Sequence, residues 1–126
     1  MIKEFKKGSK TKISKNFNSS EFDCKCKRAG CKTTYIDMEL IDQLEELRAE
    51  IACPLTIVSG FRCVDHNKNV GGKKGSLHLV GKAADISSSE LTHKELQFFC
   101  EDFDGLGKGL NLTHVDVRGY KARWRY

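Results

Sequence analysis

The order of sequence patterns along the chain predicts an α+β domain, a small antiparallel sheet flanked by helices. Apolar residues recur at helical spacing over residues 38–51, and a capping pattern near residue 92 indicates a second helix. Short apolar runs typical of strands lie between and after these helices. The last strands are close together in the sequence, which favours antiparallel pairing. With 126 residues, no internal repeat and no linker, we expect one domain over residues 16–126, preceded by a basic arm over residues 1–15.

Residues 1–15 lack apolar periodicity. Residues 1–15 are rich in lysine, so we expect a solvated, partly ordered arm rather than a dedicated binding element. The run NFNSSEF, residues 16–22, is typical of a turn that opens a short helix. Ser19 or Ser20 is the expected N-cap of this helix.

The helix predicted over residues 38–51 carries charged residues opposite its apolar face and stops near Pro54. Its repeating apolar positions are Leu40, Leu44, Leu47 and Ile51. The run LTIVSG, residues 55–60, predicts a buried strand. Residues 64–77 contain glycines among lysines, which indicates a loop.

The second half of the chain predicts three strands and one helix. KAADIS, residues 82–87, is a short strand. THKE, residues 92–95, has the capping-box pattern and opens the helix. The expected buried face of that helix consists of Leu96, Phe99 and Phe103. Two more strands are expected in LGKGL, residues 106–110, and LTHVDV, residues 112–117, before the aromatic and basic tail GYKARWRY.

The composition narrows the classes of partner without choosing one. A formal net charge of +5 and a pI near 8.9 favour anionic surfaces such as nucleic acid, phospholipid headgroups or an acidic cell wall. No apolar run of about 18 residues is present, so we expect no membrane insertion. The N-terminal lysines are not followed by an apolar segment of the kind found in secretory signals. We therefore expect synthesis in a cytoplasm, with action outside depending on another route of release.

Three of the six cysteines, Cys24, Cys26 and Cys31, are close in sequence. They can bind a structural zinc ion, additional to the site described below, with a fourth ligand such as Cys63. Their spacing, however, is not that of a standard zinc knuckle. Reduced thiols are favoured in a chain without a secretory signal. We therefore expect free thiols, or disulfides formed after export, in preference to this second zinc.

Two histidines and two acids lie on or beside the predicted strands. His78 precedes the strand KAADIS, which contains Asp85, and alternation places His114 and Asp116 on one face of LTHVDV. Polar groups buried on a sheet need partners. Two imidazoles and one carboxylate are a suitable zinc set, with the fourth position left to water. The alternative is a hydrogen-bonded His–Asp pair without metal. The remaining histidines, expected at the surface, are His66 and His93.

Several segments together resemble the zinc D-Ala-D-Ala peptidase family, especially its short bacterial and phage members. The run SLHLVGKAAD, residues 76–85, resembles the motif S-x-H-x-x-G-x-A-x-D, and THVDVRG, residues 113–119, resembles the second motif. SGFR, followed by Asn67 and a pair of glycines, resembles a third segment. NFNSSEFDC, residues 16–24, resembles the usual opening. The motifs occur in the expected order over about residues 16–126.

The resemblance implies the α+β fold shared by these peptidases and by Hedgehog signalling domains. It implies a catalytic zinc ion held by His78, Asp85 and His114. It also implies that Arg62 and Ser76 contact the substrate. A guanidinium suits this function because it pairs bidentately with a peptide carboxylate.

The chain departs from the family pattern at the position of the general base. Many members have Glu or Asp three residues before the last histidine ligand, where this chain has Asn111, and often have His where it has Leu112. The H-x-D form offers Asp116 instead. We predict that Asp116 is the general base or orients the metal site. The alternative is a structural Asp116 paired with Arg118 or a backbone amide.

The expected function is hydrolysis of stem peptides or cross-links in bacterial peptidoglycan, by D,D-carboxypeptidase or endopeptidase action. A phage lysin, released through a holin or carried by the virion, suits the small chain and its basic charge. The main alternative is a non-catalytic, zinc-containing virion or wall-binding module of the same fold. Basic and aromatic residues in the tail RGYKARWRY can also bind single-stranded nucleic acid. Because the tail follows HVDVRG as in the family, we expect it to close the sheet, and we expect a monomer without a nucleic-acid partner.

Overall fold

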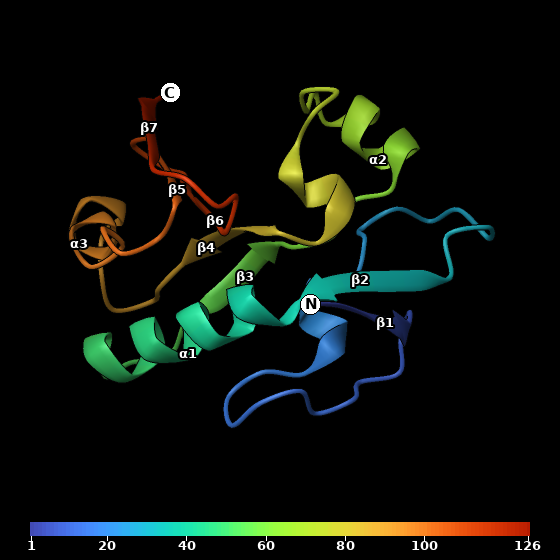
Figure 1. Cartoon of the computed structure of the whole chain (residues 1–126), viewed down its shortest axis with the longest axis horizontal. Coiled ribbons are helices and arrows are strands. Elements are labelled where there is room, and N and C mark those ends of the chain that lie inside the picture. The colour runs from blue at the N-terminus through green and yellow to red at the C-terminus, as the bar shows by residue number, and fades with distance from the viewer.

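The computed structural model describes the whole chain, residues 1–126, and contains seven strands, three α-helices and two 3-10 helices (Figure 1). The strands are β1 (Ile2–Lys6), β2 (Thr33–Asp37), β3 (Thr56–Ser59), β4 (Ala83–Ser87), β5 (Gly105–Lys108), β6 (Thr113–Asp116) and β7 (Ala122–Arg125). The helices are α1 (Met38–Ile51), α2 (Val64–Asn69), α3 (His93–Phe98), η1 (Ser19–Phe22) and η2 (Leu77–Val80). None of the helices has the length and apolar character needed to cross a membrane.

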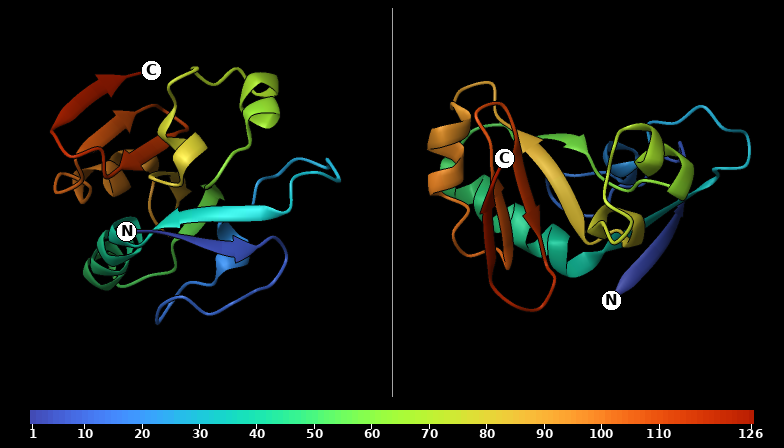
Figure 2. Two further views of the ribbon diagram at one scale, coloured as in Figure 1. Left: turned by 45° about the vertical axis from the view of Figure 1, so that its right-hand side comes forward. Right: turned by 90° about the horizontal axis from the view of Figure 1, so that it is seen from above.

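The main sheet has five strands in the order β3-β4-β6-β5-β7, and β1 and β2 form a separate two-stranded sheet. All neighbouring strands are antiparallel except β5 and β7, which are parallel. The predicted α+β class, with a mainly antiparallel sheet and flanking helices, is confirmed. The tail does close this sheet, as the edge strand β7 (Figure 2).

Helix α1 has the predicted bounds because its two ends are well specified. The side chain of Asp37 caps the N-terminus by accepting from the amide of Glu39 at 3.0 Å. Ala52 ends the helix in the left-handed conformation, with φ of 54°. The carboxylate of Asp37 also accepts from Lys82 Nζ at 2.8 Å, which ties α1 to the segment before β4.

The core occupies one face of the main sheet. Its central members are Leu40, Ile41, Leu44 and Leu47 from α1, Ile57 from β3, Ala84 and Ile86 from β4, Leu96 from α3, Leu106 from β5 and Val115 from β6. Because side chains alternate along a strand, His114 and Asp116 point to the opposite face from Val115. Figures 1 and 2 show η2 and α2 on the side of β4 away from α1. That side is the one on which the polar residues of β4 and β6 gather.

The N-terminal region is more ordered than the expected arm. Strand β1 lies within residues 1–15 and pairs with β2 in an antiparallel register that matches Phe5 with Thr34. Residues 33–37 do not stand out in the sequence because the strand is short and runs directly into α1. The cap of η1 is Asn18 rather than Ser19 or Ser20. Its side chain accepts from the amide of Ser20 at 3.0 Å.

Residues 64–69 form helix α2, whereas the glycines and lysines around them predict a loop. This helix has six residues and buries only Asn67, so it has no apolar stripe that periodicity can detect. Its N-cap is Cys63, whose sulfur accepts from the amide of His66 at 3.4 Å. The loop prediction is therefore wrong for this segment, which lies beside the candidate site.

The predictions for residues 82–117 are confirmed in β4, α3, β5 and β6. The capping box of α3 is present, with Thr92 and Glu95 bonded reciprocally at 3.1 and 2.9 Å. The helix ends at Phe98, so Phe103 reaches the core from the turn that follows rather than from the helix itself.

Candidate metal centre

Three elements bring together His78, Asp85 and His114, which are separated in the sequence. The register of β4 against β6 places Asp85 directly opposite His114. His78 comes from η2, the short helix that precedes β4. One ligand atom from each of the three residues lies within 4.8 Å of the others, and all three side chains are buried. The structure thus groups the three residues for which the sequence predicts zinc binding.

The imidazole of His78 is oriented by the backbone before α2. Its Nδ1 lies 2.7 Å from the carbonyl oxygen of Gly60. A carbonyl only accepts, so Nδ1 carries the hydrogen and donates it. In the neutral ring the lone pair is then on Nε2, which faces Asp85 Oδ1 at 3.3 Å. Ser76 supports the backbone of His78, because its hydroxyl accepts from the His78 amide at 3.2 Å.

The imidazole of His114 lies between two carboxylates. Its Nε2 lies 2.8 Å from Asp116 Oδ2, and its Nδ1 lies 3.2 Å from Asp85 Oδ1. Burial disfavours the charged ring, but the bonds with Asp116 and Asp85 raise the pKa of His114 overall. When Nε2 donates to Asp116, the neutral ring directs the Nδ1 lone pair at Asp85.

The two neutral imidazoles and Asp85 therefore direct three electron pairs at one point. Such an arrangement is repulsive unless protons or a cation occupy the space between the groups. Burial opposes the ionisation of Asp85, but His114 and His78, which stabilise the carboxylate when their rings are protonated, hold its pKa well below the usual range, so it is available as a ligand. Two nitrogens and one oxygen from the protein form the ligand set typical of catalytic zinc. The donor set fits zinc.

Arg62 holds the second oxygen of Asp85. Its Nη2 donates to Asp85 Oδ2 at 3.0 Å, its Nε to Ser59 Oγ at 3.1 Å and its Nη1 to Asn67 Oδ1 at 3.3 Å. A guanidinium has five N–H donors, so these bonds leave two free for another acceptor. The Arg62 side chain is 14% exposed, which keeps it accessible at the edge of the site. Its anchor on Asn67 depends on α2, the helix that the sequence analysis missed.

Asp116 forms both of the pairings that the sequence left open. Its Oδ2 accepts from His114 Nε2 and, at 2.7 Å, from Arg118 Nη2, while its Oδ1 accepts from Arg118 Nε at 2.9 Å. The residue is fully buried. Burial opposes ionisation, but the bonds with Arg118 and His114 lower the pKa of Asp116 to about 2. It therefore remains a carboxylate whose two oxygens are both engaged.

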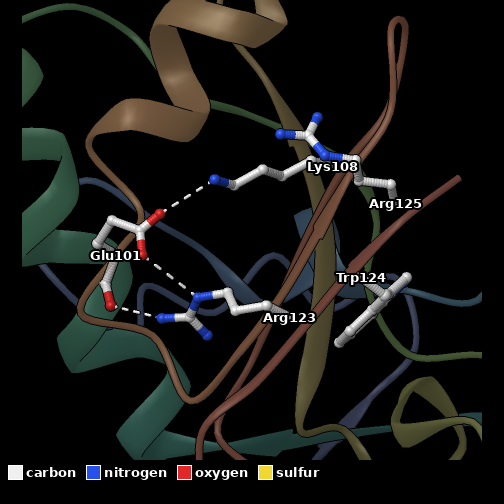
Figure 3. Close-up of a pocket in the computed structure, with 5 residues that line it drawn as sticks. All are labelled: Glu101, Lys108, Arg123, Trp124 and Arg125. Carbon is white, nitrogen blue, oxygen red and sulfur yellow. Dashed lines mark hydrogen bonds and ion pairs between the residues drawn. The ribbon is translucent and has the colours of Figure 1, made fainter.

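Trp124 is a site residue that the sequence analysis did not single out. Its ring centre lies 5.2 Å from that of His114, and the guanidinium of Arg118 lies 4.9 Å from the centre of the indole. Alternation in the run ARWR would have placed Trp124 on the opposite face of β7 from Arg123. Figure 3 shows Trp124 pointing away from Arg123 and Glu101. Trp124 thus covers one side of the His114 ring.

The pocket in Figure 3 lies at β5 and β7 and has a volume of about 270 Å³. Glu101 bonds there with Lys108 at 3.2 Å and with Arg123 at 3.3 Å. These ion pairs fasten the turn after α3 to the sheet. None of the three predicted metal ligands lines this pocket.

The other predicted positions lie outside the centre. Asn111 is exposed in the turn between β5 and β6. His93, expected at the surface, is half-buried and its Nδ1 lies 2.8 Å from the hydroxyl of Thr113. His66 is half-buried on α2.

A buried His–Asp–His set on the face of an α+β sheet opposite α1 defines a candidate metal-dependent hydrolase. A model of the Peptidase M15 family matches residues 15–117, most of the chain. The chain belongs to this family, whose members are zinc metallopeptidases, and its fold is the Hedgehog/DD-peptidase type. The resemblance drawn from the sequence motifs is therefore confirmed at the family level. A comparison with curated proteins finds no match.

Proposed function

We propose that the protein is a zinc-dependent peptidase that hydrolyses peptide bonds in the stem peptides or cross-links of bacterial peptidoglycan. The convergence of His78 Nε2, His114 Nδ1 and Asp85 Oδ1, in a chain of a peptidase family, carries this proposal. A zinc ion held by these residues would supply Lewis-acid activation of water and of the scissile carbonyl.

Asp116 acts in this proposal by orienting His114. Its carboxylate accepts from Nε2, which fixes the ring so that Nδ1 faces Asp85. Carboxylates behind metal-binding histidines commonly have this function. A general base must reach the proton that it removes, whereas Asp116 is fully buried and both of its oxygens are engaged. The contacts therefore favour the orienting function of Asp116 over the base function.

Arg62 and Ser76 are the proposed substrate contacts. The two free N–H groups of Arg62 can donate to a carboxylate of the stem peptide while Nη2 keeps its bond with Asp85. The hydroxyl of Ser76 accepts from the His78 amide, and its own hydrogen is left to donate to a substrate carbonyl. Both side chains are only partly buried.

The proposed place of action is the bacterial cell wall, with the protein working as a phage lysin. The formal net charge of +5 supports this proposal, because a basic protein is attracted to an anionic wall. Lysis of intact or outer-membrane-permeabilised bacteria by added protein tests it. A protein that digests isolated peptidoglycan but lyses no cells would contradict the lysin function and leave the peptidase function standing.

A second candidate is a zinc-containing wall-binding module that does not hydrolyse. The site offers two carboxylates, Asp85 and Asp116, and both are engaged by histidine and arginine side chains. Asn111 stands where many family members have the acidic base, and an amide cannot accept the proton. This observation favours the second candidate.

Digestion of purified peptidoglycan decides between the two candidates. Zinc-loaded protein should release free amines and defined muropeptides, which mass spectrometry identifies together with the bond cleaved. A chelator and the His78→Ala variant should each abolish release. Binding to peptidoglycan without release, by protein shown to contain zinc at this site, would refute the peptidase and support the module.

A further inference from the structure

Three cysteines that are close in the sequence and a fourth that is distant form one cluster in the structure. Their sulfur atoms all lie within 4.8 Å of one another. The residues are Cys24, Cys26, Cys31 and Cys63. Cys63 is distant in sequence and comes from the N-cap of α2. The sequence favours free thiols over a zinc site with Cys63 as the fourth ligand, and the structure places Cys63 beside the other three.

The spacing of the sulfurs fits a metal ion better than it fits bonded pairs. The Sγ atom of Cys63 lies 3.7 Å from that of Cys24 and 3.8 Å from that of Cys26. In a tetrahedral zinc site with Zn–S bonds of about 2.3 Å, neighbouring sulfurs are about 3.8 Å apart. A disulfide requires about 2.05 Å, and all six cysteines of the chain are free.

Two cations lie beside the cluster. Lys7 Nζ is 3.5 Å from Cys26 Sγ and 3.0 Å from the Cys26 carbonyl oxygen. Arg28 Nη1 lies 3.8 Å from Cys63 Sγ. Four thiolates around one divalent ion carry a net negative charge of two, which these two side chains offset. Arg28 also pairs with Asp65, at 3.0 Å between Nε and Oδ2, so its charge is shared between that carboxylate and the cluster.

Backbone amides also point at the sulfurs. The amide of Cys63 donates to Cys24 Sγ at 3.3 Å, and the amide of His66 donates to Cys63 Sγ at 3.4 Å. Such N–H···S bonds orient and stabilise thiolate ligands around a metal. They also show that the backbone, as well as the side chains, is arranged around the cluster.

We propose that Cys24, Cys26, Cys31 and Cys63 bind a second zinc ion with a structural function. Four thiolates complete the tetrahedral shell, so no position remains open for water or substrate. The ion would fasten the loop of residues 24–31 to the N-terminus of α2. It is separate from the His–Asp–His centre and shares no ligand with it.

The proposed ion lies next to a substrate contact. Cys63 directly follows Arg62, whose guanidinium bonds with Asp85 and with Asn67 on α2. Holding Cys63 in place therefore holds both the backbone of Arg62 and the helix that supports its side chain. The cysteine zinc positions Arg62 without touching the substrate itself.

Metal analysis of matched variants tests the proposal. Purified wild type, loaded with zinc under reducing conditions and desalted, should contain two zinc ions per chain. The His78→Ala/His114→Ala variant should retain one, and the Cys26→Ser/Cys63→Ser variant should also retain one. Cys53→Ser is the matched control, because Cys53 lies outside the cluster, and should retain two. One zinc ion per wild-type chain, with the double-histidine variant empty, would refute the proposal.

Two further measurements test the proposal even if the cysteine variants fail to fold, because neither of them uses a cysteine substitution. Cobalt bound to the double-histidine variant should give intense thiolate-to-metal charge-transfer absorption. Iodoacetamide mapping of native wild type should show Cys26 and Cys31 protected until a chelator removes the metal. Rapid alkylation of metal-loaded protein, a disulfide among the four residues, or iron in place of zinc would each overturn the assignment. All these outcomes are independent of whether peptidoglycan is cleaved.

Discussion

The function of Asp116 can be decided by the substitution Asp116→Asn. Asn has nearly the same shape, so the fully buried site can accept it without a cavity. The substitution removes the charge that bonds with His114 Nε2 at 2.8 Å and with Arg118 at 2.7 and 2.9 Å. We expect the zinc affinity of the His–Asp–His centre to fall while the protein still folds.

The size of the effect follows from the geometry around His114. One charge-assisted bond fixes the ring and makes it a stronger ligand, and loss of such a partner costs about 10–100-fold in metal affinity. In free energy this is about 1.4–2.7 kcal/mol. Because the base function requires contact with reacting atoms and the orienting function does not, kcat should largely recover when zinc saturates the site.

The assay is a zinc titration in a competing chelator, followed by peptidoglycan hydrolysis at saturating zinc. Asp102→Asn is the matched control, because Asp102 is exposed and the charge change is the same. The reasoning would be refuted if the variant bound zinc as tightly as wild type but lost kcat at saturating zinc. In that case the limb of the pH–rate profile that reports the general base should also be lost. Asp116 would then be the general base.

Two further predictions concern Gly105 and Asp37. A Cβ at Gly105 would lie 2.2 Å from both carboxylate oxygens of Asp116, so Gly105→Ala should displace that carboxylate and weaken zinc binding about 10–100-fold, as measured in the same titration. Gly75→Ala, where a Cβ meets nothing within 4 Å, should leave zinc affinity unchanged, and equal affinities in the two variants would contradict the prediction. Burial opposes ionisation of Asp37, but the bond with Lys82 lowers the pKa of Asp37 below 3.8. The stability that the Asp37 carboxylate contributes is therefore complete above pH 3.8 and is lost as the pH falls through the lowered pKa. The Asp37→Asn variant keeps an N-cap side chain. In urea unfolding, its free energy of unfolding should be lower than that of wild type at neutral pH and equal to it in acid. A constant difference at all pH values would contradict the linkage.

The sequence predicts the helices and strands that bury one face, because burial of one face makes apolar residues recur at a regular spacing. Helix α1 repeats apolar residues over four turns and packs them into the core, so its bounds can be read directly. Strand β6 alternates, and Val115 and His114 do face opposite sides. Strand β1 and helix α2 have no such pattern. β1 is stabilised by pairing with β2, and α2 buries only Asn67, so both depend on contacts that are distant in the sequence.

The candidate centre was predictable to the extent that its residues lie in motifs. His78, Asp85 and His114 follow from the spacing and the family resemblance, and the structure groups them. What the motifs do not contain is the direction of each imidazole. That direction depends on the Gly60 carbonyl, a backbone atom, and on the hydrogen bond between His114 and Asp116.

The cysteine cluster shows why sequence spacing alone is a poor guide to a metal site. Cys24, Cys26 and Cys31 do not match a standard zinc-knuckle spacing. Cys63, which the sequence offers as the fourth ligand, is brought to them by the backbone before α2, which packs against η1. A Cβ at Gly60 would lie 2.7 Å from Phe22 Cα, so only glycine permits this approach, and it brings Cys63 within reach of Cys24.

Residues 60–63 therefore connect the two clusters of ligating side chains. The Gly60 carbonyl orients His78, and the amide of Arg62 donates to the His78 carbonyl at 3.0 Å while its guanidinium holds Asp85. Cys63 is the next residue, and its sulfur lies in the cysteine cluster. A displacement of Cys63 shifts backbone atoms that touch His78, because the adjacent residue, Arg62, donates its amide to His78. The His–Asp–His geometry is thus stabilised from the cysteine side of the domain as well as from the sheet.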